Sequence, residues 1–468
     1  MGPLMFGGLI AFMLLGYPVA FSLAAVGLFF GFIGIELGFF EMALLQALPD
    51  RVFGILSNDL LLAIPFFTFM GAILERCGLA EDLLEGMGQL FGPVRGGLAF
   101  SVIAVGAILG ATTGTVAASV IAMGLISLPV MMRYGYNMRI ATGVIAASGT
   151  IAQLIPPALV LIVLADQLGL SVGDMYAGAI GPAIVQILLF CAFIGLVCLF
   201  RPHYVPALPR EARTLGGWPL ARKILWGVVP SLVLIFLVLG TILLGVATPT
   251  EGGAMGAVGA MALAAAQRRL TWNLMWQGMG STMRITTMVI FILIGATVFG
   301  LVFRGVDGDL WVEHMLTSLP GGQTGFLLAV NLFIFVLAFF LDFFEIAFIV
   351  IPLLAPVAAK LGIDLVWFGV LIGANLQTSF MHPPFGFALF YLRGVAPREV
   401  KSSDIYWGAV PWVGLQLVLV ATIIFWPGLV TDFLPRAAPA EPGRIEIPVE
   451  APVADPAAEI ERQLRQQR

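Results

Sequence analysis

Long apolar runs without a charged residue are the feature that most limits what this chain can fold into. Each is long enough to cross the hydrocarbon core of a bilayer. Hydrophobic residues make up 60% of the chain and charged residues only 11%, against about 45–50% and about 25% in soluble domains. Lipid must therefore surround most of the chain, which predicts an all-α polytopic membrane protein and excludes a cytosolic enzyme, a nucleic-acid-binding protein and a disordered scaffold. The runs cover residues 1–35, 96–132, 140–165, 175–200, 224–250, 285–303, 365–392 and 405–431.

Two segments carry a polar break near their centre. Residues 96–132 contain Gly110-Ala-Thr-Thr-Gly-Thr115, and residues 324–361 contain Asp342 and Glu345. Irregular backbone inside a membrane is tolerated only where protein or a water-filled cavity surrounds it. We therefore expect each segment to be a re-entrant hairpin of two half-length helices.

An internal repeat relates the two halves of the chain through a shift of 227 positions. A repeat of this kind points to a secondary transporter. The basic residues occupy different relative places in the two halves, which favours inverted repeats over parallel ones. The shift superposes Pro93 on Pro320, Pro129 on Pro356, Gly135 on Gly362 and Pro156-Pro157 on Pro383-Pro384, and after three inserted residues it superposes Asp174 and Tyr176 on Asp404 and Tyr406.

The repeat predicts the following organisation. The basic linker, residues 201–223, should be cytoplasmic by the positive-inside rule, and the Pro-, Ala- and Glu-rich tail, residues 434–468, should be disordered. Whether residues 1–35 form one helix or two stays open. The first repeat, 1–200, contains leading helices, a hairpin at 96–132, a broken span at 138–165 and a final helix at 174–200; the second, 224–430, contains leading helices, a hairpin at 324–361, a broken span at 365–392 and a final helix at 404–428.

The two Pro-Pro pairs should interrupt the spans that contain them, because proline lacks an N–H and clashes with the preceding turn. Half-helix ends then offer carbonyl groups to a cation and N–H groups to an anion, and the Ser, Thr and Asn oxygens nearby are hard ligands. The alternative is a Pro-kinked helix whose Ser and Thr side chains bond back to their own carbonyls. The candidate cation-binding residues are Thr113, Gly114, Thr115, Ser148, Gly149, Thr150, Asp342, Asn375, Gln377, Thr378 and Ser379; the candidate substrate-binding residues are Thr112, Pro156, Pro157, His382, Pro383 and Pro384.

The buried acids and the histidine each allow two interpretations. A carboxylate in mid-membrane costs about 2.5–3.5 kcal/mol on insertion scales. Asp342 therefore either takes part in cation coupling or protonation, or is the N-cap of a half-helix, and Glu345 fits the cap better. His382 either titrates or hydrogen-bonds to a neighbouring carbonyl, and we expect the hydrogen bond. We also expect Thr248 or Thr250 to cap a helix whose first turn contains Glu251.

The polar segments resemble those of one transporter family, the large membrane subunit of tripartite ATP-independent periplasmic (TRAP) transporters. The resemblance covers about residues 1–430 and rests on four motifs: 110–119, Ala147-Ser-Gly-Thr-Ile-Ala-Gln-Leu-Ile-Pro-Pro157, Ala247-Thr-Pro-Thr-Glu251 and 375–386. It implies an elevator-type ion transporter of the bacterial inner membrane that imports an organic acid, usually driven by sodium, with no other cofactor. It also implies two partners, a small four-helix membrane subunit and a periplasmic substrate-binding protein.

One motif suggests a narrower substrate class. The stretch 375–393 resembles the branch of the family associated with 2-oxo acids and other monocarboxylates. Many relatives have a threonine where His382 stands, which puts the second ion site in doubt.

Three other kinds of protein remain to be weighed against this interpretation. A stand-alone sodium- or proton-coupled carboxylate transporter would need no binding protein. An intramembrane enzyme or lipid flippase would need a catalytic pair at one depth, and we find no nucleophile–base pair, nucleotide-binding loop or metal-ligand spacing in the sequence. A channel would need polar faces along several spans, whereas polarity here is concentrated at the two hairpins and the two Pro-Pro breaks.

Overall fold

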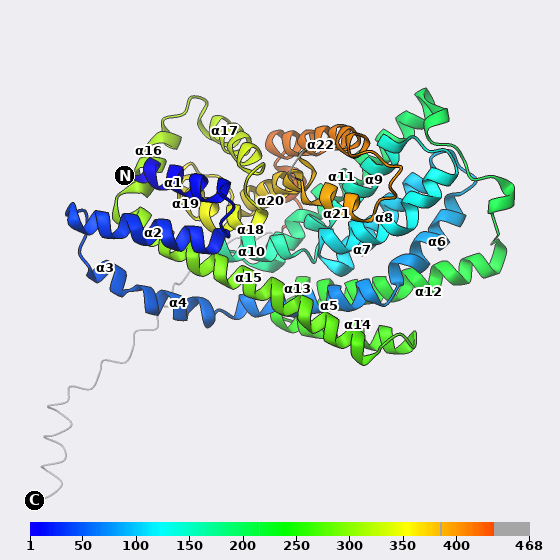
Figure 1. The fold of residues 1–468 in the computed structure, drawn as a ribbon, viewed down its shortest axis with the longest axis horizontal. Helices are drawn as coiled ribbons and strands as arrows, with labels where there is room; N and C mark the ends of the chain where they lie inside the picture. The colour runs from blue at the N-terminus through cyan, green and yellow to red at the C-terminus, as the bar shows by residue number, and fades with distance from the viewer. Residues whose placement is uncertain (215, 384–385, 435–468) are drawn as a thin grey trace, which may run out of the picture. The chain divides into compact units, whose positions relative to one another are not determined.

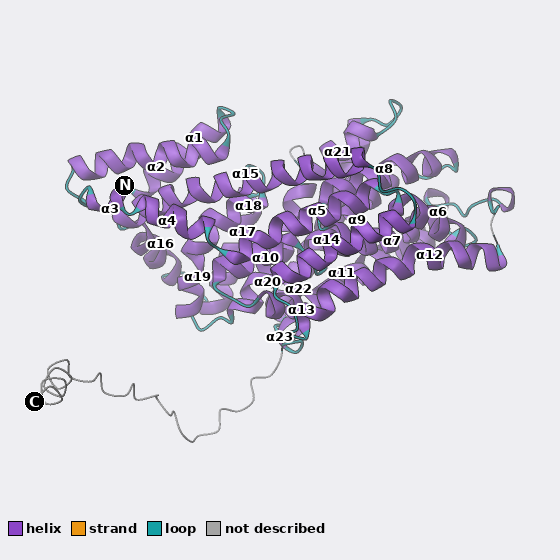
Figure 2. Ribbon diagram, turned by 90° about the horizontal axis from the view of Figure 1, so that it is seen from below, coloured by secondary structure: helices purple, strands orange, loops and turns teal. Residues whose placement is uncertain are grey.

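The chain is helical throughout the part that the structure describes. The computed structural model describes residues 1–214, 216–383 and 386–434, and within these ranges it contains helices and no strand (Figure 1, Figure 2). The predicted all-α polytopic fold is confirmed. Among these residues, seven helical segments are long and apolar enough to cross a membrane: Val19–Glu36, Val116–Arg133, Val172–Phe200, Gly217–Leu243, Trp272–Gly305, Phe343–Lys360 and Ser402–Phe425.

The N-terminal apolar run forms two helices, which answers the question that the sequence left open. Gly16 adopts a left-handed conformation with φ +85, and Pro18 follows it in an extended conformation as the N-cap of the second helix. Proline cannot donate to the preceding turn, so the chain reverses here. The helices of this part are α1 (Gly2–Leu14), α2 (Val19–Glu36), α3 (Ala43–Gln46), α4 (Leu48–Leu56), α5 (Ala63–Arg76) and α6 (Leu79–Phe91).

The segments assigned to the first hairpin and the first broken span are each divided into two helices. The hairpin segment turns at Gly114 and Thr115, and the span is interrupted between Thr150 and Leu159. A single long helix follows. These helices are α7 (Gly97–Thr113), α8 (Val116–Arg133), α9 (Met138–Thr150), α10 (Leu159–Leu168) and α11 (Val172–Phe200).

The second half begins with three long helical segments. The first continues from α12 (Gly217–Ile235) through a π-helical turn into α13 (Thr241–Leu243). The next, α14 (Pro249–Ala266), begins with a capping box in which Thr248 accepts from the N–H of Glu251 and the Glu251 carboxylate accepts from the N–H of Thr248. The predicted cap is confirmed for Thr248. The helices α15 (Trp272–Gly305) and α16 (Gly308–Thr317) complete this part.

The remaining elements follow the same order as their counterparts in the first half. The helix α17 is separated by residues 338–342 from α18, which continues through a π-helical turn into α19, and an interrupted span and a long helix come next. In each hairpin segment the second helical part, α8 in the first and Phe343–Lys360 in the second, is long and apolar enough to cross the membrane completely. The re-entrant course of the hairpins and the inversion of the repeats therefore stay predictions. The elements are α17 (Gly322–Leu337), α18 (Phe343–Glu345), α19 (Ile351–Lys360), α20 (Leu365–Leu376), α21 (Phe387–Val395), α22 (Ser402–Phe425) and α23 (Gly428–Thr431).

Helices distant in sequence pack side by side. The helix α2 lies along α15, α5 packs against α14 and α15, and α22 packs against α9 (Figure 1). The first half of each interrupted span is enclosed where it approaches the interruption, because every residue of α9 from Ala141 to Thr150 and of α20 from Val366 to Leu376 is buried. The other helices therefore shield the two interruptions from lipid.

The contact between α2 and α15 depends on a glycine, and this generates a first prediction. A Cβ at Gly295 would overlap the carbonyl oxygen of Ala20, so Gly295→Ala should force the two helices apart and lower the unfolding temperature. On the same helix, Gly300 has open space around its Cα, so Gly300→Ala should leave stability equal or slightly higher because alanine favours helix. Thermal unfolding of the purified protein measures both, and equal effects of the two substitutions would contradict the packing argument.

Candidate functional site

The first interruption contains two buried hydroxyl groups, those of Ser148 and Thr150. The helix α9 ends at Thr150, well before Pro156, and continues as a 3-10 turn, Ile151–Gln153. The Thr150 hydroxyl donates to the carbonyl of Ala147 at 2.8 Å. The Ser148 hydroxyl is fully buried and has no hydrogen-bond partner among the described residues.

The second interruption has the same construction. The helix α20 ends at Leu376 and continues as a 3-10 turn, Gln377–Met381. The Thr378 hydroxyl donates to the carbonyl of Asn375 at 2.7 Å, and the Ser379 hydroxyl donates to that of Leu376 at 2.6 Å. The Asn375 side-chain oxygen is buried and without a partner in the described part of the chain.

These contacts combine features of both interpretations of the Pro-Pro spans. Back-bonding of hydroxyls to nearby carbonyls does occur, at Thr150, Thr378 and Ser379. However, the α-helices end at these points and do not merely bend. The shift of 227 positions superposes Ser148 on Asn375, and each of these residues keeps a buried oxygen that is free for a ligand within the described residues.

The tip of the first hairpin segment lies beside the first interruption. Gly114 is left-handed with φ +61, and Thr115 is extended. A Cβ at Gly114 would lie 3.6 Å from the carbonyl oxygen of Pro157. The hydroxyls of Thr112 and Thr113 bond back to carbonyls of α7, so they stabilise the end of this helix.

Glycines on α7 allow the helix to approach the interruption closely. A Cβ at Gly106 would lie 2.7 Å from the Cβ of Ser148, and one at Gly110 would lie 2.9 Å from the Cα of Ala152. Any larger residue would push α7 away. The spacing of four residues between these glycines thus lets α7 cover the backbone near Ser148.

The second hairpin tip is held by a capping box. The N–H of Phe343 donates to Asp342 Oδ1 at 2.7 Å, and the N–H of Asp342 donates to Glu345 Oε2 at 2.9 Å. Both carboxylates therefore stabilise the start of α18, as a pair of acids at a helix N-terminus does. This supports the capping interpretation of Glu345, while the cation role of Asp342 stays a prediction because the cap engages only one of its oxygens.

The structure corrects the expectation for His382. Its two ring nitrogens are buried and have no hydrogen-bond partner among the described residues, so the predicted bond to a neighbouring carbonyl is wrong. The ring instead packs between Phe335 and Phe339, at centroid distances of 4.3 and 4.2 Å. Aromatic packing holds the side chain in place beside the second interruption.

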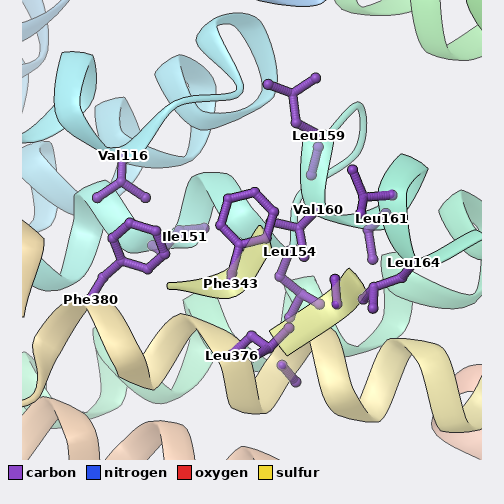
Figure 3. Packing of buried hydrophobic residues seen from close by; sticks show 14 of the residues in the cluster. Val116, Ile151, Leu154, Leu159, Val160, Leu161, Leu164, Phe343, Leu376 and Phe380 are labelled. Atoms are coloured by element: carbon purple, nitrogen blue, oxygen red, sulfur yellow. The ribbon is translucent and has the colours of Figure 1, made fainter. Parts of the chain in front are cut away.

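The hairpin tips and the interruptions converge on one apolar cluster. Figure 3 shows Val116 from the start of α8, Ile151 and Leu154 from the first interruption, Phe343 from α18 and Phe380 from the second interruption as part of one packed group. The helix α10 contacts α18 and α20, and the 3-10 turn of the second interruption contacts α9. Four segments that are far apart in sequence thus enclose a common centre.

The proline candidates contribute differently. Pro156 and Pro157 are buried and Pro383 is half-buried, and Pro384 lies outside the described residues, as does the predicted tail beyond Leu434. The candidate sets omit Gln153, which is buried within the first interruption, and three buried polar residues on helices that pack against the interruptions. Each of these three is an isolated polar residue in an apolar run, which is the signal that could have found it; they are Asn331, Gln186 and Gln416.

Asn331 connects the second hairpin segment to the second interruption. The Asn375 amide donates to the backbone oxygen of Asn331 at 2.8 Å and to its side-chain oxygen at 3.1 Å. The two hydrogen bonds fix α17 against α20 beside the free oxygen of Asn375.

An all-helical fold with two spans interrupted inside the protein, each with polar groups at the interruption, is typical of secondary transporters. The chain belongs to the family described as "Tripartite ATP-independent periplasmic transporter, DctM component", whose sequence profile matches residues 6–429. It is therefore a multi-pass inner-membrane permease and not an enzyme. Transporters of this family combine the permease with a substrate-binding protein and a small membrane subunit.

Similar proteins carry names for several acids. The C4-dicarboxylate TRAP transporter large permease protein DctM of Pseudomonas aeruginosa is 29% identical over 386 residues, which cover 82% of this chain and 88% of that protein. The 2,3-diketo-L-gulonate TRAP transporter large permease protein YiaN of Escherichia coli is 26% identical, covering 91% and 96%. The crystal structure of the Alcanivorax borkumensis YdaH transporter has the same fold, with a TM-score of 0.56, 17% identity, and coverage of 84% of this chain and 90% of that one.

The capping box generates a second prediction. Asparagine caps a helix as well as aspartate does, so Asp342→Asn should keep the stability of the protein. Asp342→Ala should lower the free energy of unfolding by about 1 kcal/mol because it removes the cap. Unfolding of the purified protein measures both, and equal destabilisation by the two substitutions would show that the charge matters more than the cap.

Proposed function

We propose that the chain is the translocating subunit of a sodium-coupled secondary transporter that imports an organic acid delivered by a periplasmic binding protein. The observation that carries the proposal is the pair of buried oxygens without a hydrogen-bond partner in the described residues, on Ser148 and Asn375. Oxygens in such surroundings lower their energy by binding a small cation. Their equivalent places in the two halves support one site in each half.

Each proposed cation site combines a hairpin tip with an interruption. The first consists of Thr113, Gly114, Thr115, Ser148, Gly149 and Thr150, and the second of Asp342, Asn375, Gln377, Thr378 and Ser379. The substrate would bind between the tips, near Thr112, Pro156, Pro157, His382, Pro383 and Pro384. Neighbours of both sets, Val116 and Ile151 of the first half and Phe343 and Phe380 of the second, pack in one apolar cluster, which supports the arrangement (Figure 3). An elevator movement of this region would carry both sites across the membrane together.

An acid anion is the substrate class that the relatives support. Their names refer to C4-dicarboxylates, to 2,3-diketo-L-gulonate and, for a permease of Oleidesulfovibrio alaskensis, to isethionate. All are small anions. A 2-oxo acid or another monocarboxylate stays our prediction for this chain from the residues around His382.

Uptake into proteoliposomes tests the coupling. With this chain, the small membrane subunit, the binding protein and its acid, we expect uptake that requires an inward sodium gradient and needs no ATP. Omitting the binding protein should abolish uptake. Uptake that persists without a sodium gradient would remove the coupling claim, and sodium-driven uptake without the binding protein would favour the stand-alone transporter.

The Ser148 hydroxyl generates a further prediction. Ser148→Ala removes one proposed ligand, and we expect the sodium concentration for half-maximal uptake to rise about tenfold, equivalent to about 1.4 kcal/mol. The control is Ser231→Ala, which removes an equally buried serine hydroxyl that bonds to Gly227 in α12. An unchanged sodium requirement in Ser148→Ala would exclude this residue from the site.

A further inference from the structure

Two hydrogen bonds between glutamines and the interruptions connect the two halves of the chain. Gln416 of α22 donates through Nε2 to the Thr150 hydroxyl of the first interruption at 2.9 Å. Gln186 of α11 donates through Nε2 to Gln377 Oε1 of the second interruption at 2.6 Å. All four side chains are fully buried, with 0% exposure.

The two bonds are counterparts of each other. The shift that superposes Asp174 on Asp404 also superposes Gln186 on Gln416, and the shift of 227 superposes Thr150 on Gln377. The last long helix of each half thus donates a glutamine to the interruption of the other half. A single buried amide could be accidental, but two at matching places, with exchanged partners, indicate a shared role.

Close backbone packing fixes the positions of the donating helices. A Cβ at Gly143 of α9 would overlap the carbonyl oxygen of Gly408 on α22. At the matching place, a Cβ at Gly178 of α11 would lie 3.2 Å from the side chain of Val366 on α20. Each glutamine therefore projects from a helix that packs closely against the interrupted span to which the glutamine donates its hydrogen bond.

The amide groups are only partly satisfied. The Oε1 atoms of Gln186 and Gln416 and the Nε2 atom of Gln377 are buried without a hydrogen-bond partner among the described residues. Leaving such groups unpaired in an apolar interior is costly, and leucine would fill the same volume without this cost. A polar ligand bound beside these amides would supply the missing partners.

We propose that Gln186 and Gln416 are positioning residues of the two cation sites, and that each ties one site to the opposite half of the chain. This proposal rests on the proposed function. Gln416 orients the Thr150 hydroxyl, and Gln186 orients the Gln377 amide. Because the donating helices α11 and α22 contact each other, with Phe190 of α11 packed against Trp412 of α22, filling one site stabilises the other, and the coupling is reciprocal.

Sodium dependence of uptake tests the proposal, with Gln186→Leu, Gln416→Leu and the double variant. Each single substitution should raise the sodium concentration for half-maximal uptake about fivefold, the effect of losing one hydrogen bond, and should lower the Hill coefficient. The double variant should change the half-maximal concentration by less than the product of the single effects. The KM for the acid at saturating sodium should stay constant, which a general structural defect would not allow.

The matched control is Gln89→Leu. Gln89 lies on α6 and bonds to the carbonyl of Ala212, away from both interruptions, so its replacement should leave the sodium dependence unchanged. If the wild-type protein requires sodium and the Gln186 and Gln416 variants keep the same sodium dependence, the positioning role is overturned and the proposed function is not. Wild-type uptake that is independent of sodium would overturn the proposed function and this inference with it.

A binding measurement keeps the test decisive if a leucine variant does not transport. In detergent, sodium should raise the unfolding temperature of the wild-type protein and of Gln89→Leu. Gln186→Met and Gln416→Met keep about the same side-chain length but lose the N–H donor without adding a charge, and they should need about fivefold more sodium for the same shift. An unchanged sodium titration in both methionine variants would contradict the proposal.

Discussion

Lipid offers no hydrogen bonds, so a helix that is interrupted inside a bilayer has to find partners for its exposed backbone within the protein. The structure meets this constraint by enclosing both interruptions in other helices. The glycines of α7 bring one helix against the backbone near Ser148, and α22 covers the opposite side through the contact of Gly143 with Gly408. The surrounding helices are thus arranged about two short stretches of irregular chain.

Polar and apolar groups serve different purposes at this centre. The apolar cluster of Val116, Ile151, Phe343 and Phe380 removes water from the neighbourhood of the interruptions (Figure 3). In such surroundings electrostatic interactions are strong, and an oxygen without a partner is expensive. A cation that binds such an oxygen gains more than it would in water, which explains how a few hydroxyl and amide groups can form an ion site.

The sequence predicted the elements better than it predicted their ends and their contacts. The Pro-Pro pairs indicated where the spans are interrupted, because proline acts on its own local backbone, but the α-helices already end at Thr150 and Leu376. The contacts of His382, Gln186 and Gln416 depend on partners from distant segments, and an isolated polar residue in an apolar run carries no local pattern that names its partner.

The exchange of glutamines between the halves has a consequence for how the protein is made. Thr150 and its donor Gln416 are 266 residues apart in the chain. At a synthesis rate of about 5–20 residues per second, the ribosome needs roughly 13–53 s to produce the donor after the acceptor. During this delay the first interruption has the cover of α7 but not that of α22, so the Thr150 hydroxyl lacks its donor until the last long helix is made.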